Sequence, residues 1–165
     1  MQAMVLTVIG RDKAGLINEI ATAVSECKGN WLRSSFCHLA GQFAGFVEVL
    51  LEQDMHNELI RKCHAIANLQ ITLTPASEHV DTRSKRIRMT VTGNDRQGIV
   101  NDITTTLKTF SVNIREMETR CESAANWGSP LFSAKLNLLC ADEVEASELK
   151  SAIEALADDL IVEFE

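Results

Sequence analysis

The sequence has no tyrosine, no long apolar run and no C-x-x-C pair of cysteines. A membrane-spanning helix needs about 18 or more consecutive apolar residues, so we expect no membrane span. The N-terminus enters an apolar, strand-like pattern without a preceding basic segment, so we expect no signal peptide. The five cysteines have no regular spacing, which is typical of free thiols in a reducing compartment, and we expect the protein to be cytoplasmic.

An excess of positive charge is also lacking. The 165 residues include 16 Lys and Arg against 23 Asp and Glu, which gives a formal net charge of -7. Nucleic-acid affinity comes largely from the neutralisation of phosphates, so no direct nucleic-acid binding is expected. The one short basic cluster is interpreted as a solvated linker that runs into an exposed strand, with contact to an acidic partner or a phosphate as the alternative; it comprises Arg83, Lys85, Arg86 and Arg88.

The sequence repeats itself at an offset of about 83 positions, longer than the roughly 20 to 50 residues of a solenoid unit. Val5–Ile20 reads VLTVIGRDKAGLINEI, and Arg88–Ile103 reads RMTVTGNDRQGIVNDI. We therefore predict two small domains, at residues 1–76 and 86–165, with a linker at 77–85. The repeat aligns three pairs of polar or turn residues: Asp12 with Asp95, Gly15 with Gly98, and Asn30 with Asn113.

Both copies show the same order of strand and helix patterns, strand-helix-strand-strand-helix-strand. This is the ferredoxin-like order, and it predicts an α+β fold in which each copy is a four-stranded antiparallel sheet with both helices on one face. In the first copy the predicted strands are Met4–Ile9, Trp31–Leu39, Phe43–Leu51 and Leu69–Leu73, with helices whose apolar residues fall within 16–27 and 59–67. In the second copy they are Ile87–Val91, Asn113–Cys121, Leu131–Leu139 and Leu160–Phe164, with helices over 99–110 and 149–156.

Several local features carry their own expectations. Gly29 can supply the left-handed conformation that ends the first helix, and Asp54 can cap the second. The strand that begins at Asn30 is expected to lie beside the first strand, so that its start comes near the turn that ends the first strand. The longer hairpin of the second copy carries Trp127, interpreted as a packing residue or, alternatively, as a cover for a ligand or a contact for a partner.

In each copy the first strand leads through a glycine-containing polar turn directly into a helix. Free N–H groups and the partial positive charge at a helix N-terminus favour a carboxylate or phosphate, and a glycine lets the anion approach the backbone. A nucleotide loop is excluded, because Leu16 and Ile17 stand where a P-loop needs Lys and Ser or Thr. The second copy has Ile99 and Val100 at those positions.

A small zwitterion fits these turns better. Asp12 and Asp95 can receive the ammonium group of an amino acid whose carboxylate lies at the helix terminus, or they can cap the helix. Asn30 and Asn113 can complete each site through their amides. A purely structural role remains the alternative, because glycine and aspartate are common turn residues.

The motif Asp-x-x-Gly-[Leu/Ile]-[Ile/Val]-x-x-Ile, followed by an asparagine that opens the next strand, resembles an ACT domain. Two such units without an attached enzyme resemble the glycine cleavage system transcriptional repressor family. The resemblance implies an amino-acid-responsive regulator, expected to be a homodimer, that binds glycine or serine at domain or subunit interfaces. It also implies contact with a separate DNA-binding transcriptional activator. The ligand-binding residues that it implies are Asp12, Gly15, Asn30, Asp95, Gly98 and Asn113.

One departure concerns the ligand, because serine-binding ACT domains carry asparagine where this chain has Asp12 and Asp95. No zinc spacing, cofactor loop or nucleophile signature is present, so no metal, cofactor or catalytic residue is predicted. Cys37 and His38 are neighbours on a strand and point to opposite faces, which disfavours a shared metal. Two alternatives stay open: a ligand-free protein-interaction module built from ACT domains, and a small enzyme of ferredoxin-like fold.

Overall fold

The computed structural model describes residues 1–77, 85–123 and 130–165, which fold as two compact units divided at residues 79/80. Each unit is described by itself. The predicted linker overlaps residues that are not described, and the predicted domain bounds stay a prediction. Trp127 and most of the longer hairpin also lie outside the described residues.

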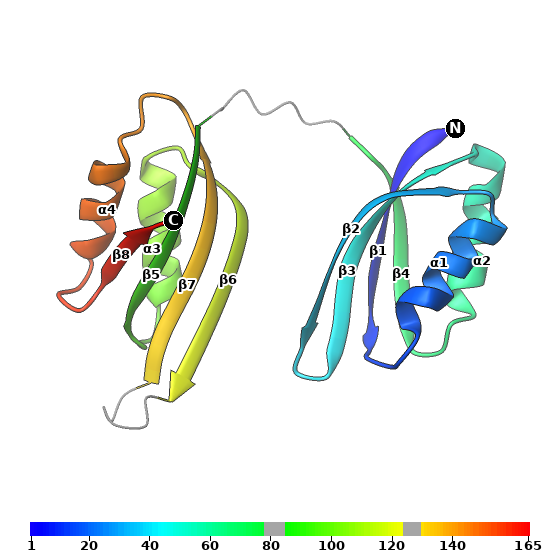
Figure 1. The fold of residues 1–165 in the computed structure, drawn as a ribbon, viewed down its shortest axis with the longest axis horizontal. Helices are drawn as coiled ribbons and strands as arrows, with labels where there is room; N and C mark the ends of the chain where they lie inside the picture. Colours follow the sequence, from blue (N-terminus) through cyan, green and yellow to red (C-terminus); the bar gives the residue numbers. More distant parts are fainter. Residues whose placement is uncertain (78–84, 124–129) are drawn as a thin grey trace. The chain divides into compact units, whose positions relative to one another are not determined.

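The first unit follows the predicted order of elements (Figure 1). A short 3-10 helix, η1, precedes its second helix. The elements are β1 (Gln2–Arg11), α1 (Leu16–Glu26), β2 (Asn30–Leu39), β3 (Gln42–Leu51), η1 (Gln53–Met55), α2 (His56–His64) and β4 (Leu69–Pro75).

The second unit repeats this order without a described counterpart of η1. Its elements are β5 (Lys85–Asn94), α3 (Ile99–Thr109), β6 (Asn113–Ser123), β7 (Pro130–Cys140), α4 (Ala146–Glu154) and β8 (Ile161–Phe164).

Each unit forms one four-stranded antiparallel sheet, in the order β2-β3-β1-β4 in the first unit and β6-β7-β5-β8 in the second. Both helices of a unit cover the same face of its sheet (Figure 1). The predicted fold class is therefore confirmed for both copies.

The predicted neighbour of the first strand was wrong. The strand that begins at Asn30 does not lie beside β1, because β3 lies between them and pairs with both. The hairpin after β2 returns the chain to the middle of the sheet, so β2 becomes an edge strand. The second unit has the same arrangement, with β7 between β5 and β6.

Each core lies between one sheet face and the two helices that cover it. Alternation along β1 places Met4, Leu6 and Val8 in the core of the first unit. Alternation along β3 places Phe43, Val47, Val49 and Leu51 in the same core. From the helices the core receives Leu16, Ile20, Ala23, Val24, Leu59 and Cys63. The second unit repeats this core, with Ile99, Ile103, Leu107, Leu149 and Ile153 from its helices.

Two local predictions were wrong. Lys28, with φ 54°, adopts the left-handed conformation after α1, and Gly29 does not. Gly29 is instead set by packing, since an added Cβ would lie 3.0 Å from Val24 and 3.1 Å from Leu51. Asp54 does not cap α2, because it lies inside η1 and the residue before α2 is Met55, without a side-chain cap.

Candidate functional site

The β1–α1 turn of the first unit is an exposed segment held by backbone contacts. The Asp12 amide donates to the Gly41 carbonyl at 3.3 Å, which ties the turn to the β2–β3 hairpin. Gly15 has φ 85° immediately before α1, and an added Cβ there would meet nothing within 4 Å. The helix start therefore stays open to solvent, and the glycine is required by backbone conformation rather than by space.

The β5–α3 turn of the second unit has the same construction. The Asp95 amide donates to the Pro130 carbonyl at 2.8 Å. Gly98 also has φ 85° and also has free space where a Cβ would lie. The equivalence predicted from the repeat thus extends to the backbone conformation of both turns.

The aspartates do not cap these helices, so that alternative was wrong. Gly15 and Gly98 occupy the N-cap positions, and neither helix has a side-chain cap hydrogen bond. The Asp12 side chain is 49% exposed. Both carboxylates therefore stand before a helix N-terminus without capping it. The first helical N–H is already used within each turn, since Leu16 N–H donates to the Lys13 carbonyl at 3.4 Å and Ile99 N–H donates to the Arg96 carbonyl at 3.3 Å. A ligand carboxylate would therefore have to bind the helical N–H groups that follow these two.

An ion pair links each turn to the first turn of its helix. Lys13 Nζ lies 2.7 Å from Glu19 Oε1, and Arg96 Nη1 lies 2.6 Å from Asp102 Oδ2. Exposed pairs of this kind contribute little stability, about 0–1 kcal/mol. Their position at both turns shows that each site carries a local cation beside its aspartate, already paired with a helix carboxylate.

Different residues lie beside the two aspartates. His38 Nε2 lies 3.6 Å from Asp12 Oδ2. Cys121 occupies the equivalent place in the second unit, and its thiol donates a hydrogen bond to Asp95. Desolvation, and then the charge and hydrogen bond of Asp95, raise the pKa of the Cys121 thiol. The two aspartates therefore have chemically different neighbours, an imidazole beside Asp12 and a thiol beside Asp95. Sequence reasoning missed both residues because they come from the following strand pair.

The asparagines lie far from the turns of their own units. Asn30 pairs with Leu50 at one end of β3, whereas Arg11 pairs with Gln42 at the other. The eight residues from 42 to 50 span roughly 26 Å of strand. Asn113 lies at the corresponding end of β6, opposite Leu139. The structure therefore brings Asp12 and Gly15 together, and Asp95 and Gly98, but it does not bring either asparagine to the turn of its own unit.

Asp159 forms a hydrogen bond with the backbone at the start of the second turn. Its Oδ2 accepts a hydrogen bond from the Asn94 amide at 2.7 Å, where β5 ends. This backbone hydrogen bond lowers the pKa of the Asp159 carboxyl. The sequence held no signal for this contact, because the two residues lie far apart in the chain.

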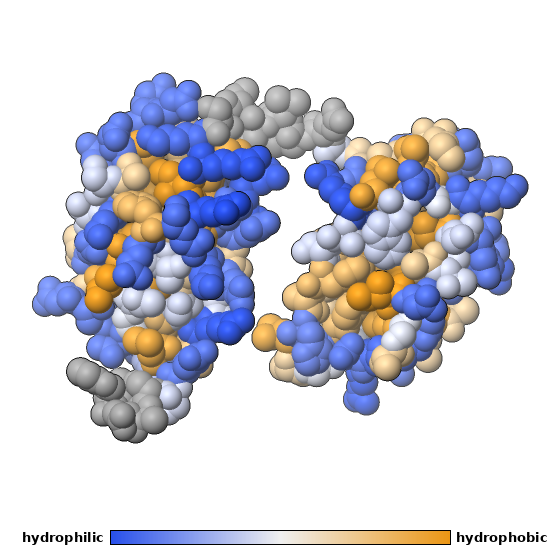
Figure 2. Space-filling model, viewed as in Figure 1, coloured by the Kyte–Doolittle hydropathy of each residue, from blue (hydrophilic) through white to orange (hydrophobic). Residues whose placement is uncertain are grey.

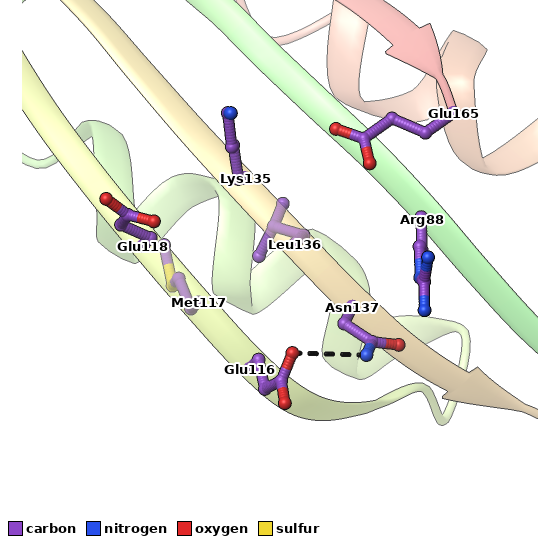
Figure 3. A pocket seen from close by; sticks show the side chains of 8 residues that line it. All are labelled: Arg88, Glu116, Met117, Glu118, Lys135, Leu136, Asn137 and Glu165. Atoms are coloured by element: carbon purple, nitrogen blue, oxygen red, sulfur yellow. Dashed lines mark hydrogen bonds between the residues drawn. The ribbon is translucent and has the colours of Figure 1, made fainter. Parts of the chain in front are cut away.

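An open hollow of about 470 Å³ lies beside the first turn, lined in part by Gly10, Arg11, His64 and Asn68. A second hollow, of about 440 Å³, lies on the sheet face of the second unit that points away from α3 and α4 (Figure 3). Arg88 and Lys135 line this second hollow together with three glutamates, and Glu116 accepts a hydrogen bond from Asn137. The predicted site residues line neither hollow.

The remaining candidate chemistry is sparse within residues 1–77, 85–123 and 130–165. No three His, Cys, Asp or Glu residues gather there as a metal site would require. Cys63 is buried in the core, and Cys37 and His38 pair with residues on opposite sheet faces. In the described part of the chain, no helix is long and apolar enough to cross a membrane.

Residues 2–73 match the family model of the ACT domain, and the second unit repeats the topology of the first. The chain has a tandem ACT-like fold. This confirms the resemblance seen in the doubled Asp-x-x-Gly motif. The ACT-like turn, edge strand and helix N-terminus are thus present twice in the protein.

Solved structures resemble the whole tandem chain. An unknown protein from Galdieria sulphuraria superposes with a TM-score of 0.86 at 27% identity, over 99% of this chain and 97% of that one. A protein provisionally named as a glycine cleavage system transcriptional repressor superposes with a TM-score of 0.64 at 15% identity, over 99% of this chain and 97% of that one. At that identity the second likeness establishes the shared fold alone. No curated protein matches the chain.

Proposed function

We propose that this tandem ACT-like protein is a non-enzymatic regulator that responds to a small amino acid, with glycine or serine the favoured ligands. The observation that carries the proposal is the doubled turn. Each unit presents an exposed aspartate and a left-handed glycine immediately before a helix. The helix N-terminus offers amides to a carboxylate, and the aspartate offers a partner to an ammonium group.

Each site is completed by an asparagine from an ACT unit of a second copy. Asn30 cannot reach the turn of its own unit, because roughly 26 Å of strand separates them. β2 is an edge strand of its sheet. Antiparallel pairing of two such edges would place the start of one β2 beside the end of the other. Asn30 would then approach the partner's turn, and the edge of β6 would bring Asn113 in the same way.

The regulatory output is the control of glycine cleavage genes as a transcriptional corepressor, through a DNA-binding activator protein. The net charge of -7 supports a protein partner over direct contact with DNA. Ligand binding at an interface between copies would favour one arrangement and so shift the population able to engage that partner. A cytoplasmic location fits this role.

Thermal unfolding of the full chain against each of the twenty amino acids tests the ligand. A ligand that binds only the native state raises the unfolding midpoint. We expect glycine or serine to do so, and we expect Asp12→Ala with Asp95→Ala to abolish the shift. Asp54→Ala is the matched control, because it removes an exposed carboxylate in η1, at the end of β3 that lies away from the turn of its own unit. The absence of any shift in the wild-type protein would overturn the proposal.

A ligand-free interaction module is the second candidate. The ion pairs Lys13–Glu19 and Arg96–Asp102 favour it. Each places a cation, already paired with a helix carboxylate, beside the helix N-terminus to which a ligand carboxylate would bind. Under this reading Lys13→Ala leaves the unfolding midpoint insensitive to amino acids. Under the sensing proposal the amino-acid shift persists in that variant.

A further inference from the structure

The sheet of the first unit has a face that points away from α1 and α2, called here the outer face. Alternation along the strands identifies its residues, because Met4, Leu6 and Val8 point into the core. The outer face comprises Val5, Thr7, Ile9 and Arg11 of β1, Gln42, Ala44, Phe46, Glu48 and Leu50 of β3, Arg33, Ser35, Cys37 and Leu39 of β2, and Gln70, Thr72 and Thr74 of β4.

Large apolar side chains are exposed on this outer face. Phe46 is 58% exposed, Ile9 47% and Leu39 76%. Phe46 lies on the central strand β3, between Thr7 of β1 and Ser35 of β2. A contiguous apolar surface of this kind marks an interaction site more often than a scattered exposed residue does.

The second unit provides an internal comparison, because the strand registers align the two sheets position by position. Most outer-face positions that are apolar in the first unit carry polar or charged residues in the second unit. Long hydrophilic side chains project from the strand side of the second unit, while tan and orange residues gather over that of the first (Figure 2). The equivalent pairs are Val5 and Arg88, Ile9 and Thr92, Leu39 and Glu122, Ala44 and Ser133, and Phe46 and Lys135.

The fold therefore does not require an apolar outer face, since the second unit has the same topology with polar or charged residues at these positions. Leu131 and Ile161 are exposed apolar residues on the corresponding face of the second unit, both toward one end of its strands. The apolar centre belongs to the first unit alone. The topology of the sheet does not account for it.

We propose that the outer face of the first unit packs against the same face of a second copy of this chain. The outer face carries three formal charges. Arg33 and Glu48 form an ion pair with each other, and Arg11 lies at the end of β1, opposite Gln42. The part of the face around Phe46 is thus neutral in a chain of net charge -7. Two copies can meet over this central part without bringing like charges together, and nothing there selects a charged partner.

The size and shape of the face suit this occupant. Four strands about 4.8 Å apart and about eight residues long cover roughly 500 Å² per copy, so a symmetric pair buries about 1,000 Å², which is the minimum area expected of a biological interface. Short side chains flank Phe46 on three sides, namely Thr7, Ser35 and Ala44, and Glu48 lies on the fourth. A twofold-related Phe46 can pack into the space above them, as side chains interdigitate in a β-sandwich.

Cys37 provides a native reporter of this contact. It pairs with Ala44 on the outer face and is exposed. At a protein concentration about ten times the dissociation constant, about four fifths of the chains are dimeric by mass action. Alkylation of Cys37 in the full chain, followed by mass spectrometry, should therefore be about fivefold slower than in the dilute protein.

Phe46→Lys copies the residue that the second unit carries at the same position, so a sheet of this fold accepts it. We expect this variant to remove the concentration dependence of Cys37 alkylation. We also expect its mass in sedimentation to fall to about half of the wild-type value. Lys135→Ala, the matched control in the second unit, should change neither. Circular dichroism checks that the variant remains folded.

Two results would overturn the inference. One is wild-type Cys37 that reacts at the same rate at every protein concentration. The other is a folded Phe46→Lys protein that protects Cys37 as the wild type does, which would assign the association to another surface such as the β2 edge. Neither result depends on amino-acid binding, so this inference and the proposed function can fail separately.

Discussion

Gly10 lies against the backbone of Asn68, so closely that an added Cβ would come within 2.3 Å of the Asn68 carbonyl oxygen. Its equivalent in the second unit, Gly93, faces the side chain of Leu160 instead, at 2.7 Å from Cδ2. A backbone carbonyl cannot rotate away, whereas the end of a leucine side chain can. The same glycine is thus required more strictly in the first copy than in the second.

Gly10→Ala is therefore expected to destabilise the first unit by about 2–3 kcal/mol, and Gly93→Ala to destabilise the second by about 1 kcal/mol. Calorimetric unfolding of the full chain, with amide hydrogen exchange to assign each transition to its unit, measures both effects. Equal costs at the two positions would contradict the backbone explanation.

Gly15→Ala tests the left-handed conformation at the first turn. The φ of 85° is strained for a residue with a Cβ, although no atom lies within 4 Å of that position. We expect a loss of about 1–2 kcal/mol, entirely from backbone strain. Gly15→Asn should cost less in the same unfolding experiment, because asparagine enters this region more readily. If alanine and asparagine cost the same, the strain is not the cause.

Asp159→Ala tests the carboxylate that accepts the Asn94 amide. Because this hydrogen bond lowers the folded-state pKa of Asp159, its stabilisation is present above the ordinary pKa of 3.8 and is lost as the pH falls through the lower folded value. The variant should unfold at a lower temperature than the wild type at neutral pH, and the difference should disappear in strong acid. Asp158→Ala, which removes the neighbouring carboxylate, is the control. A difference that persists unchanged in acid would rule out this contribution.

Cys63 should make the first unit sensitive to alkali. Burial raises the pKa of its thiol from 9.0 to about 11, so the folded state keeps the proton that the unfolded chain releases. The resulting stability is complete below about pH 9 and is lost as the pH rises through about 11, a change of order 2–3 kcal/mol by linkage. Cys63→Ala should lose less stability over this interval in denaturant unfolding. If the two proteins lost the same stability over this pH interval, burial of the Cys63 thiol would not be the cause.

The strand and helix order was predictable because it depends on local alternation and helical spacing. Leu16, Ile20 and Val24 recur at helical intervals, and Met4, Leu6 and Val8 alternate, so each element shows its buried face in the sequence. Details at element ends were less predictable. Lys28, and not Gly29, takes the left-handed conformation. The glycine at position 29 is required for a different reason, the close approach of Val24 and Leu51.

The candidate site was only partly predictable. Asp12 and Gly15 belong to one short turn, so their proximity follows from the chain itself. His38, Cys121 and Asp159 reach the turns through strand pairing or loop contacts between residues distant in sequence, and no local pattern marks them. The distance between Asn30 and Asp12 was misjudged, because the sequence does not state which strands are neighbours.

The sequence by itself determined the duplication, the order of elements in each copy, the buried faces and the paired turns, since all of these are carried by periodicity and by residues close in the chain. The tertiary structure alone decided the central place of β3, the separation of Asn30 from Asp12, the residue beside each aspartate and the opposite character of Phe46 and Lys135 on equivalent sheet faces. The physical reason is that strand order and register arise from long-range pairing. A residue's neighbours across a sheet are therefore fixed by the folded chain and not by its position along it.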